Sequence, residues 1–209
     1  MNIPVVYEDD WLLVVDKPSG LLSIPTPKNE RRTLTSILND DLRGRGLSYR
    51  LHPCHRLDRE TSGLIIYAKG KSAQRKMMEL FKQREVKKKY IAFVQGRPEP
   101  TEGQIKSPIA AQAALTKYKT IEKRKDFTIV EAMPLTGRTN QLRIHFKDIG
   151  HPILGETKYA FRRDFRIRAK RLCLHAKNLE FIHPFLKQKI SINSELTRDL
   201  EQFLSNHTN

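Results

Sequence analysis

The stretch that decides the fold is the segment His55-Arg56-Leu57-Asp58-Arg59-Glu60-Thr61-Ser62-Gly63, which leads directly into the apolar run Leu64-Ile65-Ile66-Tyr67-Ala68. In this segment Asp58 lies between Arg56 and Arg59. Because nearby positive charge favours the ionised form of a carboxylate, we expect Asp58 to be able to act as a nucleophile at neutral pH. The two arginines are suited to meeting a phosphate or stacking on a base. The alternative is a surface loop with a local ion pair.

Length and composition limit the class of protein. The chain has 209 residues, of which 38% are hydrophobic and 30% charged, and its net charge is +16. We therefore predict one globular domain spanning residues 1–209. Such a charge favours nucleic acid as the partner. No apolar run is long enough for a membrane span, and residues 1–10 lack a signal pattern, so we expect a cytoplasmic protein.

Two cysteines do not make a disulfide framework. Cys54 lies beside His52 and His55, and Cys173 lies near His175. A zinc site built from both clusters is conceivable, but the spacings match no metal-ligand pattern. Buried, unreactive cysteines are the expected alternative, and we predict no metal and no cofactor.

The hydrophobic pattern predicts an α+β fold with a mixed, mostly antiparallel sheet flanked by helices and loops. An exposed basic loop is expected at 24–32 and a loop or loose hairpin at 97–113, and residues 162–171 are strongly basic. Helices are expected near 33–42, from a Ser72 cap to about 84, from a Thr139 cap to Gly150, and from Ser194 onwards. Strands are expected at 11–16, 64–68, 89–94, 115–122, 127–133, 172–176 and 189–192.

Five segments in order resemble the RluA-type pseudouridine synthases. The Asp58 segment is similar to that family's aspartate motif, and Lys88-Lys89-Tyr90-Ile91-Ala92 to its tyrosine segment. The run Gly137-Arg138-Thr139-Asn140-Gln141-Leu142-Arg143-Ile144-His145, with Gly150-His151-Pro152-Ile153-Leu154-Gly155 after it, is similar to its arginine segment. The segments Asp16-Lys17-Pro18-Ser19-Gly20 and Leu174-His175-Ala176 also match. The resemblance implies a pseudouridine synthase fold over roughly residues 5–185.

The resemblance implies a reaction in which a uridine in ribosomal or transfer RNA is detached from its ribose at N1 and rejoined through C5. Asp58 would be the nucleophile, attacking the ribose or helping to expel the base by a glycal route. Tyr90 would stack on the base, and Arg143 would hold Asp58 ionised. Arg56 would fill the space left by the flipped uridine. This isomerisation needs a nucleophile, an orienting cation and an aromatic platform.

Other residues of these segments are expected to contact the substrate. They are Lys17, Arg59, Thr61 and Arg138, and for Lys17 and Arg138 support of a loop is the alternative to binding phosphate. On residue type alone, a core position is favoured over a catalytic role for Tyr90, and Arg143 could equally be an exposed helical arginine. Three histidines, at 145, 151 and 175, are expected to be structural.

Two features depart from the family pattern. Asn140 stands where the family commonly has histidine, and asparagine forms hydrogen bonds but does not titrate near neutrality. The small N-terminal RNA-binding domain of many relatives is not expected here, so the domain's own basic surface must hold the RNA, and we expect a monomer. Two other functions remain open: a non-catalytic RNA-binding or ribosome-assembly protein on the same fold, and a metal-dependent nuclease using Asp58. The sequence names neither the RNA nor the uridine.

Overall fold

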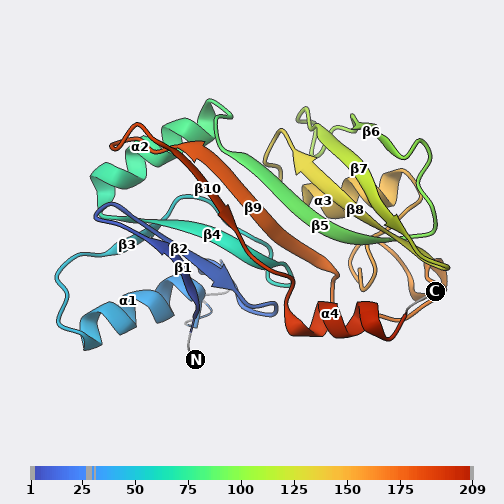
Figure 1. Cartoon of the computed structure of the whole chain (residues 1–209), viewed down its shortest axis with the longest axis horizontal. Helices are drawn as coiled ribbons and strands as arrows, with labels where there is room; N and C mark the ends of the chain where they lie inside the picture. The colour runs from blue at the N-terminus through green and yellow to red at the C-terminus, as the bar shows by residue number, and fades with distance from the viewer. Residues whose placement is uncertain (1–2, 27–29, 31, 208–209) are drawn as a thin grey trace. The chain divides into compact units, whose positions relative to one another are not determined.

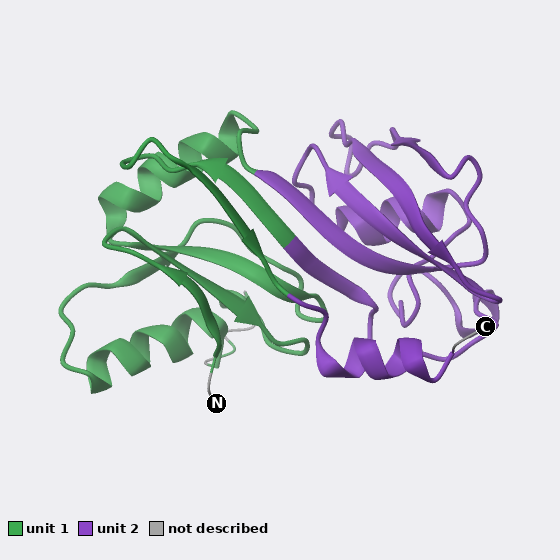
Figure 2. Ribbon diagram, viewed as in Figure 1, with its two compact units in different colours: residues 1–86, 178–194 green, residues 87–177, 195–209 purple. Residues whose placement is uncertain are grey.

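A computed structural model describes residues 3–26, 30 and 32–207, and divides the chain into two compact units (Figure 2). Unit 1 comprises residues 1–86 and 178–194, and unit 2 comprises residues 87–177 and 195–209. Part of the expected basic loop at 24–32 lies outside the described residues. The assignment of residues 1–209 to a single domain stays a prediction.

Unit 1 combines an antiparallel sheet with two helices (Figure 1). Its elements are β1 (Val5–Glu8), β2 (Leu12–Lys17), α1 (Leu34–Gly44), β3 (Leu51–Pro53), β4 (Ser62–Lys69), α2 (Lys71–Lys82) and β10 (Lys189–Asn193). Strand β2 pairs with β1 and β4, and β3 pairs with β4. The long strand β9 (Leu174–Ile182) starts in unit 2 and ends in unit 1, where it pairs with β10.

The sheet of unit 1 is apolar on both faces, which explains why its strands read as continuous hydrophobic runs. Successive side chains of a strand point to opposite faces. Val14 and its partner Ile66 belong to the core that also holds Met77 of α2. The alternate residue Tyr67 is fully buried, and its hydroxyl lies 3.0 Å from Thr35 Oγ1 of α1.

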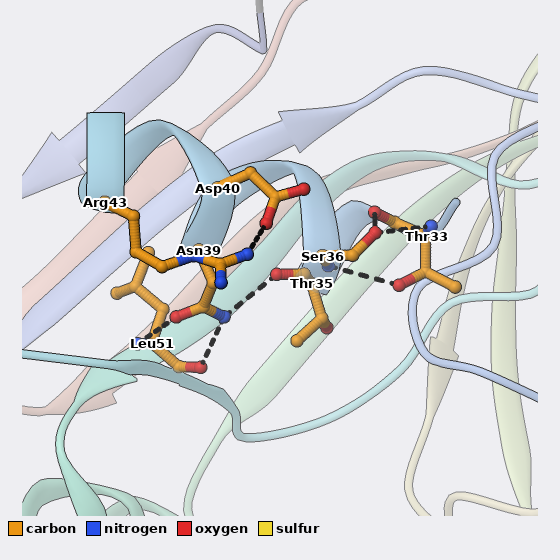
Figure 3. A network of polar contacts seen from close by, with 7 residues as sticks. All are labelled: Thr33, Thr35, Ser36, Asn39, Asp40, Arg43 and Leu51. Carbon is orange, nitrogen blue, oxygen red and sulfur yellow. Dashed lines mark hydrogen bonds and ion pairs between the residues drawn. The ribbon is translucent and has the colours of Figure 1, made fainter. Parts of the chain in front are cut away.

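Helix α1 begins where the sequence predicted, because Thr33 caps it. Thr33 Oγ1 accepts a hydrogen bond from Ser36 N at 3.2 Å, and Ser36 Oγ accepts one from Thr33 N at 2.9 Å, a reciprocal arrangement that satisfies two backbone donors. Asn39 joins the helix to β3, since its amide donates to Leu51 O and its oxygen accepts from Leu51 N (Figure 3).

Unit 2 contains four strands that pair antiparallel in the order β5-β8-β7-β6. Its elements are β5 (Lys87–Gln95), β6 (Glu102–Ile105), β7 (Thr116–Lys123), β8 (Phe127–Pro134), α3 (Gln141–Asp148), the 3-10 turn η1 (Arg162–Asp164) and α4 (Arg198–Ser205). Phe93, Phe127 and Phe146 anchor its core, and Leu200 of α4 is buried in it.

The predicted fold class, α+β with a mixed and mostly antiparallel sheet, is confirmed. Three helix starts were wrong. Helix α2 follows Gly70, and no Ser72 side chain caps it; α3 follows Asn140 rather than Thr139; α4 follows Thr197, three residues after the start predicted at Ser194. Ser194 instead donates to Asp16 Oδ2 at 2.5 Å. Strands β1, β3 and β6 were not predicted; β3 has only three residues, and most residues of β1 and β6 are exposed.

No helix in the described part of the chain is long and apolar enough to cross a membrane.

Candidate active site

The aspartate segment forms the connection from β3 to β4 in unit 1, and the preceding residues hold its backbone in place. Ser23 Oγ donates to Leu57 O at 2.8 Å and accepts from Leu57 N at 3.1 Å. Ser19 Oγ donates to Glu60 O at 2.6 Å, and Gly20 N donates to Arg59 O at 2.8 Å. The backbone before and after Asp58 is therefore held by residues that lie 34 to 41 positions earlier in the chain.

Lys17 is the strongest of these supports. Its side chain is fully buried at the end of β2, and its ammonium donates to the carbonyls of Pro18, Leu21 and Arg59 at 2.9, 2.7 and 3.0 Å. An ammonium has three protons to donate, which matches these three carbonyls in number. This geometry favours the loop-supporting alternative for Lys17 over phosphate binding.

The other residues of the segment differ in exposure. Asp58 is half-buried, and Arg56 and Arg59 are exposed. Arg59 forms an ion pair with Glu30, so a phosphate must compete with this carboxylate. The Thr61 hydroxyl is buried and has no hydrogen-bond partner among the residues described.

Tyr90 and Arg143 belong to unit 2, and Asp58 belongs to unit 1. Tyr90 lies in β5 opposite Ala132, half-buried against the core. Lys88 lies two residues earlier, on the same face of the strand, and burial lowers the pKa of its ammonium. The predicted pairing of Arg143 with Asp58 and the stacking role of Tyr90 stay predictions.

Arg143 is a buried residue of α3, not an exposed helical arginine. Its guanidinium forms a two-pronged ion pair with Glu156, with Nε donating to Oε2 at 2.6 Å and Nη2 donating to Oε1 at 2.8 Å. The Glu156 side chain has no exposed surface. A bidentate pair of this kind fixes both the position and the plane of the guanidinium.

Glu156 also organises the backbone that follows it. Its Oε1 accepts from the amides of Thr157, Lys158 and Tyr159 at 3.0, 2.7 and 3.3 Å. Burial raises the pKa of Glu156, but the hydrogen bonds from Arg143 and the backbone outweigh it and leave the pKa below its usual value. Sequence reasoning missed this residue; the signal was a lone acid directly after Gly155 and ahead of a strongly basic run.

Asn140, the departure from the family pattern, connects Arg143 to Tyr159. It has φ = 55°, in the left-handed region that asparagine tolerates better than most residues. Its Nδ2 donates to Tyr159 Oη at 2.7 Å, and its Oδ1 accepts from Arg143 Nη1 at 3.3 Å. The Arg143 guanidinium lies 5.5 Å from the centre of the Tyr159 ring. These contacts favour a bracing role for position 140.

Gln141 fixes the loop that carries Arg138. Its Oε1 accepts from Thr136 Oγ1 at 2.7 Å and from Arg138 N at 3.0 Å, while its Nε2 donates to Leu115 O and Thr116 Oγ1, each at 3.0 Å. Arg138 Nε donates to Ala113 O at 3.2 Å. Arg138 thus takes part in holding its own loop, and its binding of phosphate stays a prediction.

The histidines and cysteines have structural surroundings. His145 is buried between Thr116 Oγ1 and Ser107 O, each 2.9 Å from a ring nitrogen, and burial lowers its pKa. His151 Nδ1 lies 2.8 Å from Gln95 O. Burial raises the pKa of both Cys54 and Cys173 to about 12, which disfavours the thiolate that a metal needs. Among the described residues, no group of three or more His, Cys, Asp or Glu is placed to hold a metal ion.

Comparison of the fold with solved structures identifies the class of protein. The chain is similar to human RNA Pseudouridylate Synthase Domain Containing 4, with a TM-score of 0.82, 27% identity and coverage of 97% of this chain and 92% of that one. It is also similar to human RNA Pseudouridylate Synthase Domain Containing 1, with a TM-score of 0.73 and 25% identity over 98% and 94% of the two chains. The predicted pseudouridine synthase fold is confirmed.

Sequence comparison then gives the family. Residues 11–148 match the model of the RNA pseudouridylate synthase family, and the chain belongs to it. It is 39% identical over 198 residues to the "Dual-specificity RNA pseudouridine synthase RluA" of Escherichia coli O6:H1, covering 86% of this chain and 87% of that protein. The protein of the same name from Haemophilus influenzae is 34% identical over 209 residues, covering 92% and 93%. The predicted RluA-type family and the predicted enzyme class, an RNA pseudouridine synthase, are confirmed.

Proposed function

We propose that this enzyme converts uridine to pseudouridine in both ribosomal and transfer RNA, with Asp58 as its nucleophile. One observation carries the proposal: the region that matches the family, residues 11–148, contains the three segments named from the sequence, with Asp58, Tyr90 and Arg143. The relatives that cover most of the chain are named as dual-specificity enzymes, which supports two classes of RNA substrate.

The proposed chemistry is an isomerisation. The bond between N1 of uracil and C1′ of ribose breaks, the base turns, a bond forms between C5 and C1′, and the proton lost from C5 is balanced by one gained at N1. No electrons are transferred and no water is consumed, so the reaction as proposed requires neither a metal nor a redox cofactor. Asp58 attacks C1′ or helps to expel the base, and both routes need the carboxylate ionised.

The remaining roles concern holding and opening the RNA. Arg56 is exposed in the aspartate segment and takes the place of the uridine when it leaves the stack. Tyr90 supplies a ring for the everted base. Arg59, Thr61 and Arg138 contact the substrate, whereas Lys17 acts by holding the backbone at Arg59. We propose that the protein works as a cytoplasmic monomer, where ribosomal and transfer RNA are present.

The test is to map pseudouridines in stable RNA from a host lacking the gene, before and after incubation with the purified protein. Carbodiimide treatment makes primer extension stop at pseudouridine. New stops in both ribosomal and transfer RNA support the full proposal, new stops in one class alone remove the dual specificity, and no new stop in any stable RNA overturns the activity on this chain.

The role of Asp58 is tested with Asp58→Asn, which keeps the shape of the side chain and removes its charge. We expect no product and nearly unchanged affinity for RNA, because phosphate contacts dominate binding. Asp10→Asn is the matched control, since Asp10 is an exposed carboxylate of the same unit. Full activity of Asp58→Asn would remove Asp58 from the mechanism and leave the fold assignment untouched.

A further inference from the structure

Residues 156–171 of unit 2 form a long connection that is pinned at both ends; we call it the basic loop. At its base Cys173 N donates to Leu154 O at 2.8 Å. Gly155, with φ = 78°, lies so near the other end that an added Cβ would be 1.9 Å from Arg171 O. Connections of this length are uncommon in compact proteins and usually have a function.

The basic loop carries far more positive than negative charge. Its cations are Lys158, Arg162, Arg163, Arg166, Arg168, Lys170 and Arg171, against the acids Glu156 and Asp164. Glu156 forms an ion pair with Arg143, and Arg171 forms one with Asp199. Arg163, Arg168 and Lys170 are exposed, and in the described part of the chain none of them has an ion-pair partner. This surface attracts a polyanion.

Phe161 lies among these cations and is the most exposed large hydrophobic side chain of the described residues, at 69%. A single exposed phenylalanine is not unusual by itself. The surroundings of Phe161 are unusual, because cations lie next to aromatic rings. The guanidinium of Arg163 lies 5.2 Å from the centre of the Phe161 ring, and the ammonium of Lys158 lies 5.1 Å from the centre of the Tyr159 ring. Rings paired with cations in this way are suited to nucleobases, which have both a π-face and a nearby phosphate.

The exposure of Phe161 is fixed by its flanking residues. Ala160 and Phe165 on either side are buried, at 7% and 9% exposure. Between them the turn η1 is closed by Asp164, whose Oδ2 accepts from Phe161 N at 2.7 Å and whose N donates to Phe161 O at 2.9 Å. Arg162 Nη1 donates to Phe165 O at 2.8 Å. The ring therefore cannot turn into the core without breaking this turn. Because the backbone of the turn is already ordered, little conformational entropy is lost when a ligand binds to the exposed ring.

We propose that Phe161, with Arg163 beside its ring, is a stacking platform for an unpaired nucleobase of the RNA substrate, and that the exposed cations of the basic loop hold the adjacent phosphates. Only an unpaired base offers its face to a side chain, because the faces in a duplex are covered by stacking. The occupant is thus a single-stranded loop rather than a helical stem. The inference rests on the proposed function for the identity of the partner as RNA.

Affinity measurements with the full chain test the platform. Fluorescence anisotropy compares a labelled stem-loop RNA whose loop lacks uridine, so that no turnover occurs, with a fully paired duplex of equal length. Loss of one stacked base costs roughly 1–3 kcal/mol, so Phe161→Ala should weaken stem-loop binding by about 5- to 150-fold and leave duplex binding within about twofold. Phe161→Trp should bind the stem-loop as wild type does.

Two further variants complete the experiment. Ile121→Ala is the matched control, because Ile121 is a hydrophobic residue of the same unit that is 56% exposed on β7; it should change neither affinity. Arg163→Gln should lower the affinity for both RNAs and reduce the salt dependence of binding by about one phosphate contact. Unchanged stem-loop binding by Phe161→Ala, an equal loss on the duplex, or failure of Phe161→Trp to bind would each overturn the platform.

Failure of this inference differs from failure of the proposed function. If wild-type protein forms pseudouridine while Phe161→Ala changes neither the affinity nor the KM, the platform is wrong and the activity stands. If no RNA is modified but Phe161→Ala selectively loses stem-loop binding, the platform stands and the activity is wrong.

Discussion

Replacing Glu156 with glutamine should destabilise unit 2 strongly, because it removes the charge that balances a buried guanidinium. Arg143 is 5% exposed and Glu156 is 3% exposed. Breaking a buried ion pair by neutralising one partner costs about 3–5 kcal/mol. Such a loss is large against the 5–15 kcal/mol, roughly, by which a typical domain is stable.

The hydrogen bonds show why glutamine cannot replace glutamate here. Oε1 of Glu156 accepts from Arg143 Nη2 and from the amides of residues 157–159, and Oε2 accepts from Arg143 Nε. If the oxygen of a glutamine takes the Oε1 position, its NH2 group must face the Nε–H donor. One attractive contact becomes repulsive in a buried site, where unsatisfied polar groups are costly.

Thermal melting followed by circular dichroism measures the effect. For a protein of this size each kcal/mol shifts Tm by about 2–4 °C, so Glu156→Gln should melt roughly 6–20 °C below wild type. Hydrogen exchange should show lost protection at the amides of residues 157–159. The control is Glu195→Gln, because Glu195 pairs with Lys177 at 2.8 Å but its side chain is 86% exposed, and its Tm should not move. Equal melting of the two variants would refute the argument that burial makes the Arg143–Glu156 pair important.

Three further predictions follow from individual contacts. Lys17→Met should lower the free energy of unfolding in urea by about 1–3 kcal/mol, because the carbonyls of Pro18 and Leu21 lose the ammonium that donates to them, whereas Arg59 O keeps the amide of Gly20. Gly155→Ala should abolish the cooperative melting of unit 2 by collision with Arg171 O, whereas Gly150→Ala, which has a similar φ of 80° but open space, should lose only about 1–2 kcal/mol. Because folding lowers the pKa of Glu156, its stabilising contribution is present above the pKa of the unfolded chain and is lost as the pH falls through the folded value; acid titration of wild type and Glu156→Gln should show their stabilities converging at low pH.

The sequence predicts those elements whose pattern is set by burial. Strands β2 and β4 read as apolar runs because helices or loops cover both faces, and α1 begins at Thr33 because a local side chain satisfies its first amides. Edge strands such as β1 show no such pattern, since most of their residues are exposed. The start of α3 was missed because Asn140 takes a left-handed conformation directly before the helix. Residue propensities do not distinguish a helix that begins after Asn140 from one capped by Thr139.

For the site, local motifs placed Asp58, Tyr90 and Arg143 on a loop, a strand and a helix, but did not show what supports them. Lys17 reads as a phosphate ligand in a basic sequence, and its role in holding Arg59 O depends on a contact across 42 residues. Glu156 follows a glycine-containing turn, and its contact with Arg143 depends on how that turn returns to the helix. Such partners are set by tertiary structure, so a sequence pattern cannot assign them.

Glu156 gives a physical reason why Asn140 can stand in place of the family's histidine. The guanidinium of Arg143 is oriented by two short hydrogen bonds to Glu156, at 2.6 and 2.8 Å, whereas its bond to Asn140 is longer, at 3.3 Å. The short bond of Asn140 is the one to Tyr159, at the start of the basic loop. Position 140 therefore contributes more to the placement of this loop than to that of Arg143. On this reasoning the exchange of histidine for asparagine leaves the arginine in place and alters the surface next to it, which is where we propose that the RNA is held.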